Sequence, residues 1–288
     1  MCNLLFLIVK IIECKLLYFF ILYLKYQSNS FLDFINDESV KKNRYKIIKS
    51  FGSKGGFGSI FIGYDEKKKR EVIIKKISKS ETKEESFNRE IEAMRNMKCK
   101  YSVEYYDHYS DDENYYIIME KCDGDLNILL EEYKDGVPEQ LIKKILVQLN
   151  EAFKRMDELN IIHRDIKPEN IFIKYNSSNK KDFTVKLGDF GLSREYNNKN
   201  FSTGNGSQVF AAPEQCSNNY DPKKCDLWSI GVTIYYLKYK DANLFAFIQG
   251  NVGKYENKLL DDLVKKLIVV DPAERISWKD YFNHPFFK

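Results

Sequence analysis

The sequence predicts an α+β fold in which an antiparallel β-sheet comes first and a mainly helical part follows. Residues 45–51, 59–64 and 72–77 are short runs of apolar and β-branched residues separated by glycines and a charged turn, which is typical of antiparallel strands. Apolar residues then recur at every third or fourth position from Leu141 to Met156, which indicates a long buried helix. We place the sheet at about residues 44–120 and the helical part at about 124–288.

Composition limits the class of protein. The 288 residues are 43% hydrophobic, which is sufficient for a buried core. The net charge is +4 and no basic stripe is interleaved with aromatic residues, so nothing indicates nucleic-acid binding. Six cysteines without a Cys-x-x-Cys pair predict neither a zinc site nor a disulfide framework, and we expect a reducing, cytoplasmic setting. The run from Lys67 to Arg70 is interpreted as a solvated hairpin tip.

Residues 1–27 differ from the rest of the chain. The apolar runs 4–9 and 16–24 are broken by Lys10, Glu13 and Lys15. A membrane span needs roughly 20 apolar residues and each central charge costs about 2.5–3.5 kcal/mol, so the insertion free energy is near zero. Three interpretations stay open: membrane association through residues 4–24, a packed or interfacial helix, and a disordered extension or gene-model artefact. The polar residues 28–43 are predicted to form a linker.

The turn between the first two predicted strands is rich in glycine. It contains Gly52, Ser53, Gly55, Gly56, Phe57 and Gly58, and Ile60 follows in the next strand. Glycines let the backbone approach a phosphate chain because no Cβ stands in the way. An ordinary hairpin would show the same pattern, so this turn alone does not assign a function.

Lys75 lies in a strand whose other residues are apolar. Its ammonium group is therefore expected to point into a cleft and to need an anionic partner. A helix with an apolar stripe that includes Phe87 and Met94 comes next, and Glu90 on the flank of that stripe is the expected partner.

Residues 115–120 are predicted to form another buried strand, followed by a hinge at 121–125 and a short helix at 126–133. Pro138 suits the first position of the long helix. Residues 171–174 and 184–187 then form two short strands around a polar insert.

A polar loop follows the long helix, directly after Ile161 and Ile162. It reads His163-Arg164-Asp165-Ile166-Lys167-Pro168-Glu169-Asn170. A base on such a loop would accept a hydroxyl proton, and an amide oxygen five residues on would hold a divalent cation. The decisive question is whether the chain also supplies a phosphate cradle, a paired lysine and a second metal carboxylate in order.

With Asp189-Phe190-Gly191 and Ala212-Pro213-Glu214, the ordered set of motifs resembles the eukaryotic protein kinase family over about residues 44–288. The resemblance extends to residues 226–231, Arg275 and residues 284–287. It implies a two-lobed fold, with an N-lobe of about five antiparallel strands and one helix, a mainly helical C-lobe, and ATP and magnesium between them. Protein substrates are the implied partners, and no oligomeric state is predicted.

The resemblance also implies catalytic roles. Lys75 would hold the phosphates of ATP and be fixed by Glu90, while Asp189 and Asn170 would bind magnesium. Asp165 would accept or orient the substrate hydroxyl, and Lys167 points to the serine/threonine branch of the family. The implied nucleotide-binding residues are the glycine-rich turn residues named above together with Ile60, Ile73, Lys75, Glu120, Cys122, Asp125 and Phe172. Asp125 is either a ribose contact or a helix N-cap.

Structural and regulatory roles follow from the same resemblance. Glu214 and Arg275 would form a buried ion pair, Asp226 would brace the polar loop, and His163 would pack under Phe190. Arg164 would bind a phosphate on the activation segment, and Thr203, with Ser202 beside it, stands at the expected position. Ser207 matches the hydroxyl residue of the substrate-binding loop.

Three departures from the family pattern are visible. One glycine of the first turn is displaced, Ile73 and Phe172 are large enough to tighten the adenine slot, and the interval from Glu214 to Arg275 is short. A tight slot would raise the Michaelis constant for ATP, and the short stretch 241–253 predicts a reduced substrate-docking helix. These departures keep a second interpretation open, an ATP-binding pseudokinase scaffold. A small-molecule or lipid kinase is disfavoured by the Ala-Pro-Glu segment and by Lys167.

Overall fold

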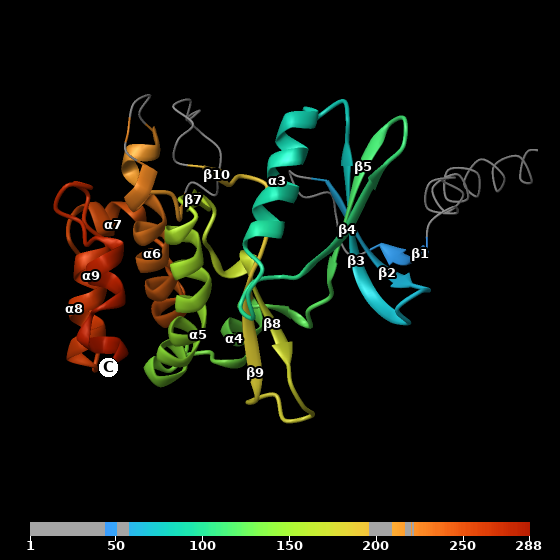
Figure 1. Ribbon diagram of the computed structural model, residues 1–288. Coiled ribbons are helices and arrows are strands. Elements are labelled where there is room, and N and C mark those ends of the chain that lie inside the picture. The colour runs from blue at the N-terminus through green and yellow to red at the C-terminus, as the bar shows by residue number, and fades with distance from the viewer. Residues whose placement is uncertain (1–43, 51–57, 196–208, 217–219, 221) are drawn as a thin grey trace, which may run out of the picture.

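The computed structural model describes residues 44–50, 58–195, 209–216, 220 and 222–288. A β-sheet part and a helical part lie side by side, so the α+β fold expected from the sequence is confirmed (Figure 1). Within the described residues, no helix is long and apolar enough to cross a membrane.

The first part is a five-stranded antiparallel sheet with the strand order β1-β2-β3-β5-β4. The strands are β1 (Tyr45–Ser50), β2 (Ser59–Asp65), β3 (Arg70–Ser78), β4 (Tyr105–Ser110) and β5 (Asn114–Glu120), and one helix, α3 (Glu84–Asn96), accompanies them. The strands expected at 45–51, 59–64, 72–77 and 115–120 are present. The sequence did not locate β4 because its residues are mostly half-buried aromatic and polar side chains without apolar alternation.

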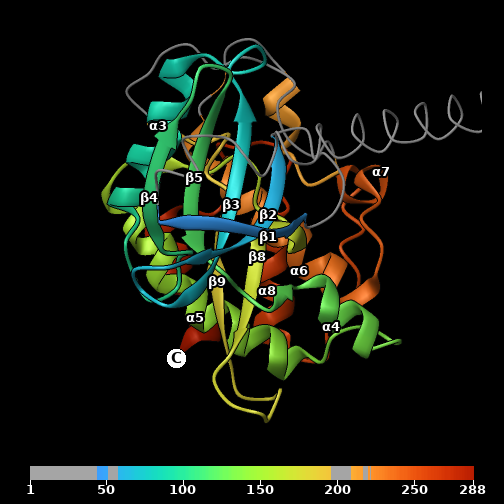
Figure 2. The same cartoon turned by 90° about the vertical axis from the view of Figure 1, so that its right-hand side faces the viewer.

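Strand β1 pairs antiparallel with β2 and runs across the outer face of the remaining strands (Figure 2). The hydroxyl of Tyr45 donates to Asp107 of β4 over 2.9 Å, although β1 pairs only with β2. This crossing closes the outer face of the sheet over a small apolar cluster. Its buried members are Tyr45, Phe61, Val72, Ile74, Tyr116 and Ile118.

The opposite, inner face of the sheet faces α3 and the helical part. Because side chains alternate along a strand, Ile73 and Lys75 of β3 point away from Val72 and Ile74. The register places Ile60 of β2 and Ile117 of β5 directly opposite Lys75. A lysine in the middle of this face therefore has apolar neighbours on both sides.

The second part contains short strands followed by helices. The strands are β6 (Gly124–Asp125), β7 (Ile161–Ile162), β8 (Ile171–Tyr175), β9 (Phe183–Leu187) and β10 (Arg194–Glu195). The helices are α4 (Asn127–Glu132), α5 (Glu139–Glu158), α6 (Cys225–Tyr239), α7 (Leu244–Ile248), α8 (Lys258–Leu267) and α9 (Trp278–Phe282). Four 3₁₀ turns are described, η1 (Pro168–Asn170), η2 (Pro213–Cys216), η3 (Pro222–Lys224) and η4 (Pro285–Phe287).

Helix α5 is the long helix expected from the apolar periodicity, with one correction at its start. Pro138 is the N-cap residue, not the first helical residue, because its ψ of 138° is extended. A proline has no N–H to donate at this end, so it is tolerated at the N-cap as it is one position later.

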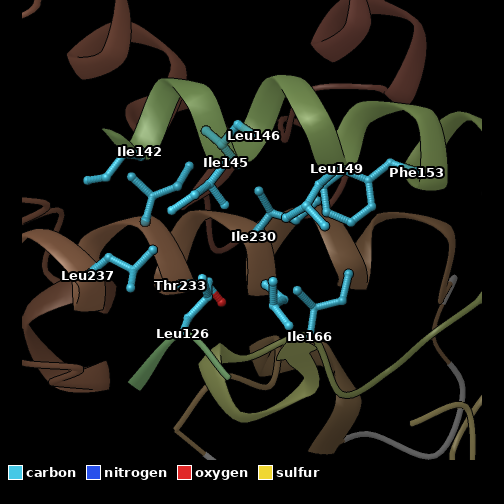
Figure 3. A pocket seen from close by; sticks show the side chains of 12 residues that line it. Leu126, Ile142, Ile145, Leu146, Leu149, Phe153, Ile166, Ile230, Thr233 and Leu237 are labelled. Atoms are coloured by element: carbon cyan, nitrogen blue, oxygen red, sulfur yellow. The ribbon is translucent and has the colours of Figure 1, made fainter. Parts of the chain in front are cut away.

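Helix α6 is apolar on all sides and almost completely buried, as expected for a central helix of a large core. Its contact with α5 leaves an apolar cavity of about 10 Å³ beside Thr233 (Figure 3). That volume is at the lower limit for one water molecule, and the hydroxyl of Thr233 is the polar group that Figure 3 shows at the cavity wall.

Candidate active site

Lys75 connects three elements that are distant in the sequence. Its Nζ atom lies 2.7 Å from Oε1 of Glu90 on α3 and 2.9 Å from Oδ1 of Asp189, which follows β9. The side chain of Lys75 is only 5% exposed. The pair predicted between Lys75 and Glu90 is therefore formed, and the carboxylate of Asp189 joins it from the helical part.

The three groups determine one another's ionisation. Burial alone would lower the pKa of Lys75, but the carboxylates of Asp189 and Glu90 raise it above its ordinary value. Burial raises the pKa of Asp189, yet the ammonium of Lys75 outweighs it and lowers that pKa. Burial raises the pKa of Glu90 despite the same ammonium. One cation thus serves two carboxylates, so the cluster favours additional positive charge.

Asp189 has an unusual backbone conformation, with φ at +58°, which a non-glycine residue adopts only when its surroundings enforce it. The carbonyl of the preceding Gly188 accepts a hydrogen bond from Nε2 of the His163 ring over 3.0 Å. The His163 ring also packs against Phe190 with a centroid distance of 5.0 Å. His163 thus supports the segment that carries Asp189.

The polar loop brings Asp165, Lys167 and Asn170 together. The Nζ atom of Lys167 and the Nδ2 atom of Asn170 both donate to Oδ2 of Asp165, each over 2.8 Å. The same amide nitrogen also donates to the backbone carbonyl of Asp165 over 2.8 Å. These bonds fix the orientation of the Asp165 carboxylate, and they leave the amide oxygen of Asn170 as its atom for a ligand.

Asp226 of α6 supports the loop from below. Its carboxylate accepts the backbone N–H groups of His163 over 2.7 Å and of Arg164 over 2.8 Å. Burial raises the pKa of Asp226, although these N–H donors and the nearby His163 oppose that shift. Arg164 has a φ of +70° and is 3% exposed, so the loop keeps a strained backbone because α6 holds it.

Several residues expected at the nucleotide lie on the inner face of the sheet or beside it. Ile60 and Ile73 are half-buried there, in register with Lys75 and with Met119 respectively. Gly58 has a φ of +121°, and a Cβ at this position would lie 2.3 Å from the carbonyl oxygen of Lys76. Only glycine is compatible with both features.

The hinge residues have separate environments. Cys122 is half-buried, and burial next to Glu120 raises its pKa to about 12. Among the described residues, no hydrogen bond involves the backbone of Cys122, which leaves that N–H and carbonyl available to a planar base. The carboxylate of Asp125 accepts the N–H of Asn127 over 2.9 Å, so it supports the first turn of α4, whose N-cap is Leu126.

The side chains of Glu120 and Phe172 contact residues of the helical part. Glu120 forms ion pairs with Lys174 of β8 and with Lys186 of β9, the latter at 3.0 Å, and its backbone N–H donates to the carbonyl of Glu104 over 2.8 Å. Phe172 lies so close to Gly188 that a Cβ there would be 2.8 Å from its ring. Phe172 therefore forms part of the floor below the Asp189 segment.

Lys174 and Lys186 were missed in the sequence. They tie the end of the sheet to β8 and β9, and Lys186 also donates to the carbonyl of Lys100 over 2.9 Å. A signal was available, because Lys186 lies between Val185 and Leu187 in an apolar strand, as Lys75 does in β3. Its partner Glu120, however, lies 66 residues earlier in the chain than Lys186 and belongs to no motif that contains Lys186.

The expected pair of Glu214 and Arg275 is present and bidentate, with distances of 2.6 Å and 3.0 Å. Other expected residues lie outside the described residues, so the structure does not place them. These are Gly52, Ser53, Gly55, Gly56 and Phe57 of the glycine-rich turn, and Ser202, Thr203 and Ser207.

The donor atoms at this site suit magnesium. In the part of the chain that the structure describes, no group of three or more His, Cys, Asp or Glu residues forms a complete metal cage. Magnesium usually binds through one or two protein oxygens together with waters and substrate phosphates. The Asp189 carboxylate and the Asn170 amide oxygen match that pattern, and the shared cation Lys75 leaves the cluster in need of positive charge.

The fold and the site together define a protein kinase. A family model described as "Protein kinase domain" matches residues 45–287, and the chain belongs to this family.

Particular relatives include a probable serine/threonine-protein kinase, fhkB, of Dictyostelium discoideum, which is 35% identical over 88% of this chain and 24% of its own length. Calcium-dependent protein kinase 4 of Plasmodium falciparum is 31% identical over 88% of this chain and 51% of its own. The serine/threonine-protein kinase ULK3 of Mus musculus is 31% identical over 81% of this chain and 52% of its own. The chain thus spans a quarter to a half of these relatives.

Proposed function

We propose that this chain transfers the γ-phosphate of ATP to serine or threonine residues of protein substrates. The observation that carries the proposal is the arrangement of Lys75, Glu90 and Asp189 around one buried ammonium group, beside a loop in which Asp165 is held by Lys167 and Asn170. Phosphoryl transfer depends on positioning and charge neutralisation, and this arrangement supplies both.

Each residue has a task in the proposed reaction. Lys75 binds the α- and β-phosphates, and Glu90 keeps its ammonium in place over 2.7 Å. Asp189 and Asn170 would hold magnesium, which offsets the charge of the transferred group when bound. The register of β2, β3 and β5 places Ile60, Ile73 and Met119 on the face that the adenine would contact.

Asp165 acts on the substrate hydroxyl. Two hydrogen-bond donors hold its Oδ2 atom, so the carboxylate is already oriented to accept or direct the hydroxyl proton. Lys167 lies beside it and neutralises charge on the phosphoryl group. Lys167 and the similarity to serine/threonine kinases support a hydroxyl of serine or threonine as the acceptor.

A pseudokinase scaffold is the second candidate function. The displaced glycine, Ile73 and Phe172 favour it, because each would weaken ATP binding. The presence and pairing of every charged catalytic residue oppose it, since a chain without turnover has no need to hold Lys75, Asp165 and Asp189 in this geometry.

We further propose that phosphorylation of Thr203 raises activity through Arg164. Arg164 is buried, and its backbone N–H is bonded to Asp226, so a phosphate bound to its guanidinium would act directly on the catalytic loop.

We also propose that residues 4–24 associate with membranes. The apolar runs in that segment support this, and the partition of the full chain against a chain without residues 1–27 tests it.

The kinase proposal is tested with the full chain, labelled ATP, magnesium and generic protein substrates. Phosphate should appear on serine or threonine, and Asp165→Asn and Asp189→Ala should reduce the rate by at least about a hundredfold while melting temperatures stay similar. Equal incorporation by the wild type and both variants would reject the kinase and favour the scaffold.

A further inference from the structure

The turn between β2 and β3 carries the exposed residues Lys67 and Lys68 and is held in place by backbone hydrogen bonds to Asp65. The carboxylate of Asp65 accepts the backbone N–H groups of Lys67 over 3.0 Å and of Lys68 over 3.1 Å. Asp65 itself is completely buried. The side chains of Lys67 and Lys68 are exposed, so the fold directs two ammonium groups into solvent from a fixed turn.

The chain enters the sheet beside this same turn. The carbonyl of Arg44 accepts the N–H of Glu66 over 2.8 Å, and the guanidinium of Arg44 bonds to Asp65 over 2.8 Å. Lys46 pairs with Glu66 over 2.7 Å. Arg44, the first described residue, therefore lies at the base of the basic turn.

Positive charge remains after the local ion pairs are counted. Glu66 is shared by Lys46 and Lys69, and these two lysines lower its pKa to about 2. Glu71 is paired with Lys121, and Asp65 with Arg44. Among the described residues, Lys67 and Lys68 have no ion pair. We call this surface the basic tip, made up of Arg44, Lys46, Lys67, Lys68, Lys69 and Arg70.

We propose that the basic tip binds an anionic phospholipid surface. Lys41 and Lys42, just before Arg44, extend its charge along the sequence, and the apolar residues 4–24 lie further upstream. A weak apolar anchor gives stable binding only with a second signal, for which a cluster of basic residues next to the anchor is suited. The proposal rests on the membrane association proposed for residues 4–24.

A membrane surface fits better than a nucleic acid. The lysines project from a hairpin turn at the end of the molecule farthest from α8 and α9, where β1 and β2 lie in Figure 1. A flat anionic surface can contact such a tip, whereas nucleic-acid sites usually track a strand along a basic groove with aromatic platforms. The sequence predicted only a solvated hairpin tip. The structure adds that Arg44, the first described residue, lies beside this tip.

The test measures flotation of the full chain with vesicles at 0.1 M salt. Neutral phosphatidylcholine vesicles report on residues 4–24, and vesicles with about 30% phosphatidylserine report on the tip as well. The variant Lys67→Glu/Lys68→Glu should bind the neutral vesicles as the wild type does, and should lose at least about tenfold in partition to the anionic vesicles. Raising the salt to 0.5 M should remove the preference of the wild type for anionic vesicles.

The matched control is Lys180→Glu/Lys181→Glu. These two exposed lysines lie in the turn between β8 and β9, at the bottom of Figure 1, and carry the same change in net charge. The control should stay within about twofold of the wild type on anionic vesicles. Equal loss in both variants, or loss in neither, overturns the basic tip. Loss of binding to an RNA oligonucleotide in the tip variant, with unchanged vesicle binding, overturns it also. A chain without residues 1–27 separates the two proposals: equal partition to anionic vesicles with and without these residues counts against residues 4–24, whereas the tip variant and its control decide on the basic tip.

Discussion

The carboxylate of Asp226 accepts the backbone N–H of Arg164 over 2.8 Å, although the two residues are 62 positions apart. It also accepts the N–H of His163. Helix α6, the most completely buried helix described, therefore determines the backbone position of the polar loop, and the orientation of Asp165 depends on a residue outside that loop.

Replacement of Asp226 by asparagine should damage both stability and activity. The amide has one acceptor where the carboxylate serves two N–H donors, so one buried donor loses its partner. We expect the free energy of unfolding to fall by about 2–4 kcal/mol, and kcat to fall more than KM rises. Urea unfolding and steady-state kinetics measure the two effects. The exposed variant Asp112→Asn should change stability by less than about 0.5 kcal/mol, and equal effects of both variants would contradict the assigned role.

The ion pair of Glu214 and Arg275 should not tolerate lysine. Arg275 is 2% exposed and binds both carboxylate oxygens, and a lysine offers a single point charge in a space shaped for a planar fork. Arg275→Lys should lower the free energy of unfolding by about 2–4 kcal/mol. Arg155→Lys, on the exposed side of α5, is the control and should cost less than about 1 kcal/mol. A similar melting temperature for Arg275→Lys and the wild type would refute this expectation.

Thr233 should be replaceable by valine with a gain in stability. Its hydroxyl is buried beside the cavity of Figure 3 and has no hydrogen-bond partner among the described residues. Valine has nearly the same shape without the unpaired hydroxyl, so the free energy of unfolding should rise by about 1 kcal/mol. Thr184→Val is the matched control, because its hydroxyl donates to Asn176 over 3.0 Å, and it should destabilise. Denaturant titration distinguishes the two signs, and destabilisation by Thr233→Val would show that the hydroxyl is satisfied.

Cys122 should react slowly with alkylating reagents. Its pKa of about 12 means that the thiolate fraction at pH 8 is about 10⁻⁴, compared with about a quarter for an ordinary thiol. Because the raised pKa favours the neutral form, the rate should rise about tenfold for each pH unit between pH 8 and pH 11. Mass spectrometry of the Cys122 peptide, with the urea-unfolded chain as reference, gives the rates. Equal rates in folded and unfolded chains would rule out the shift.

Thr203→Ala should abolish activation by phosphorylation. After phosphatase treatment and rephosphorylation, the wild type should regain activity through the phosphate contact with Arg164, and the alanine variant should stay at the basal rate. Thr203→Ser, which can still carry a phosphate, should recover. Equal activities of the wild type and Thr203→Ala after both treatments would refute the role of Thr203.

Much of the fold was predictable because local patterns are strong here. The strands with β-branched runs, helix α3 and helix α5 follow from periodicity, and the order of Lys75, Glu90, Asp165, Asn170 and Asp189 identified the family. Strand β4 escaped because its half-buried aromatic and polar residues give no alternating signal, and it becomes a strand by pairing with β5.

The sequence by itself determined the residue types of the site and their order along the chain. Only the tertiary structure decided which charged side chains pair with one another. Lys75 pairs with Asp189 as well as with Glu90, and Glu120 pairs with Lys174 and Lys186. Arg44 bonds to Asp65, at the base of the turn that carries Lys67. The physical reason is that ion pairs and hydrogen bonds act over a few ångströms in space, whereas sequence patterns record only neighbours within one strand or a few helical turns.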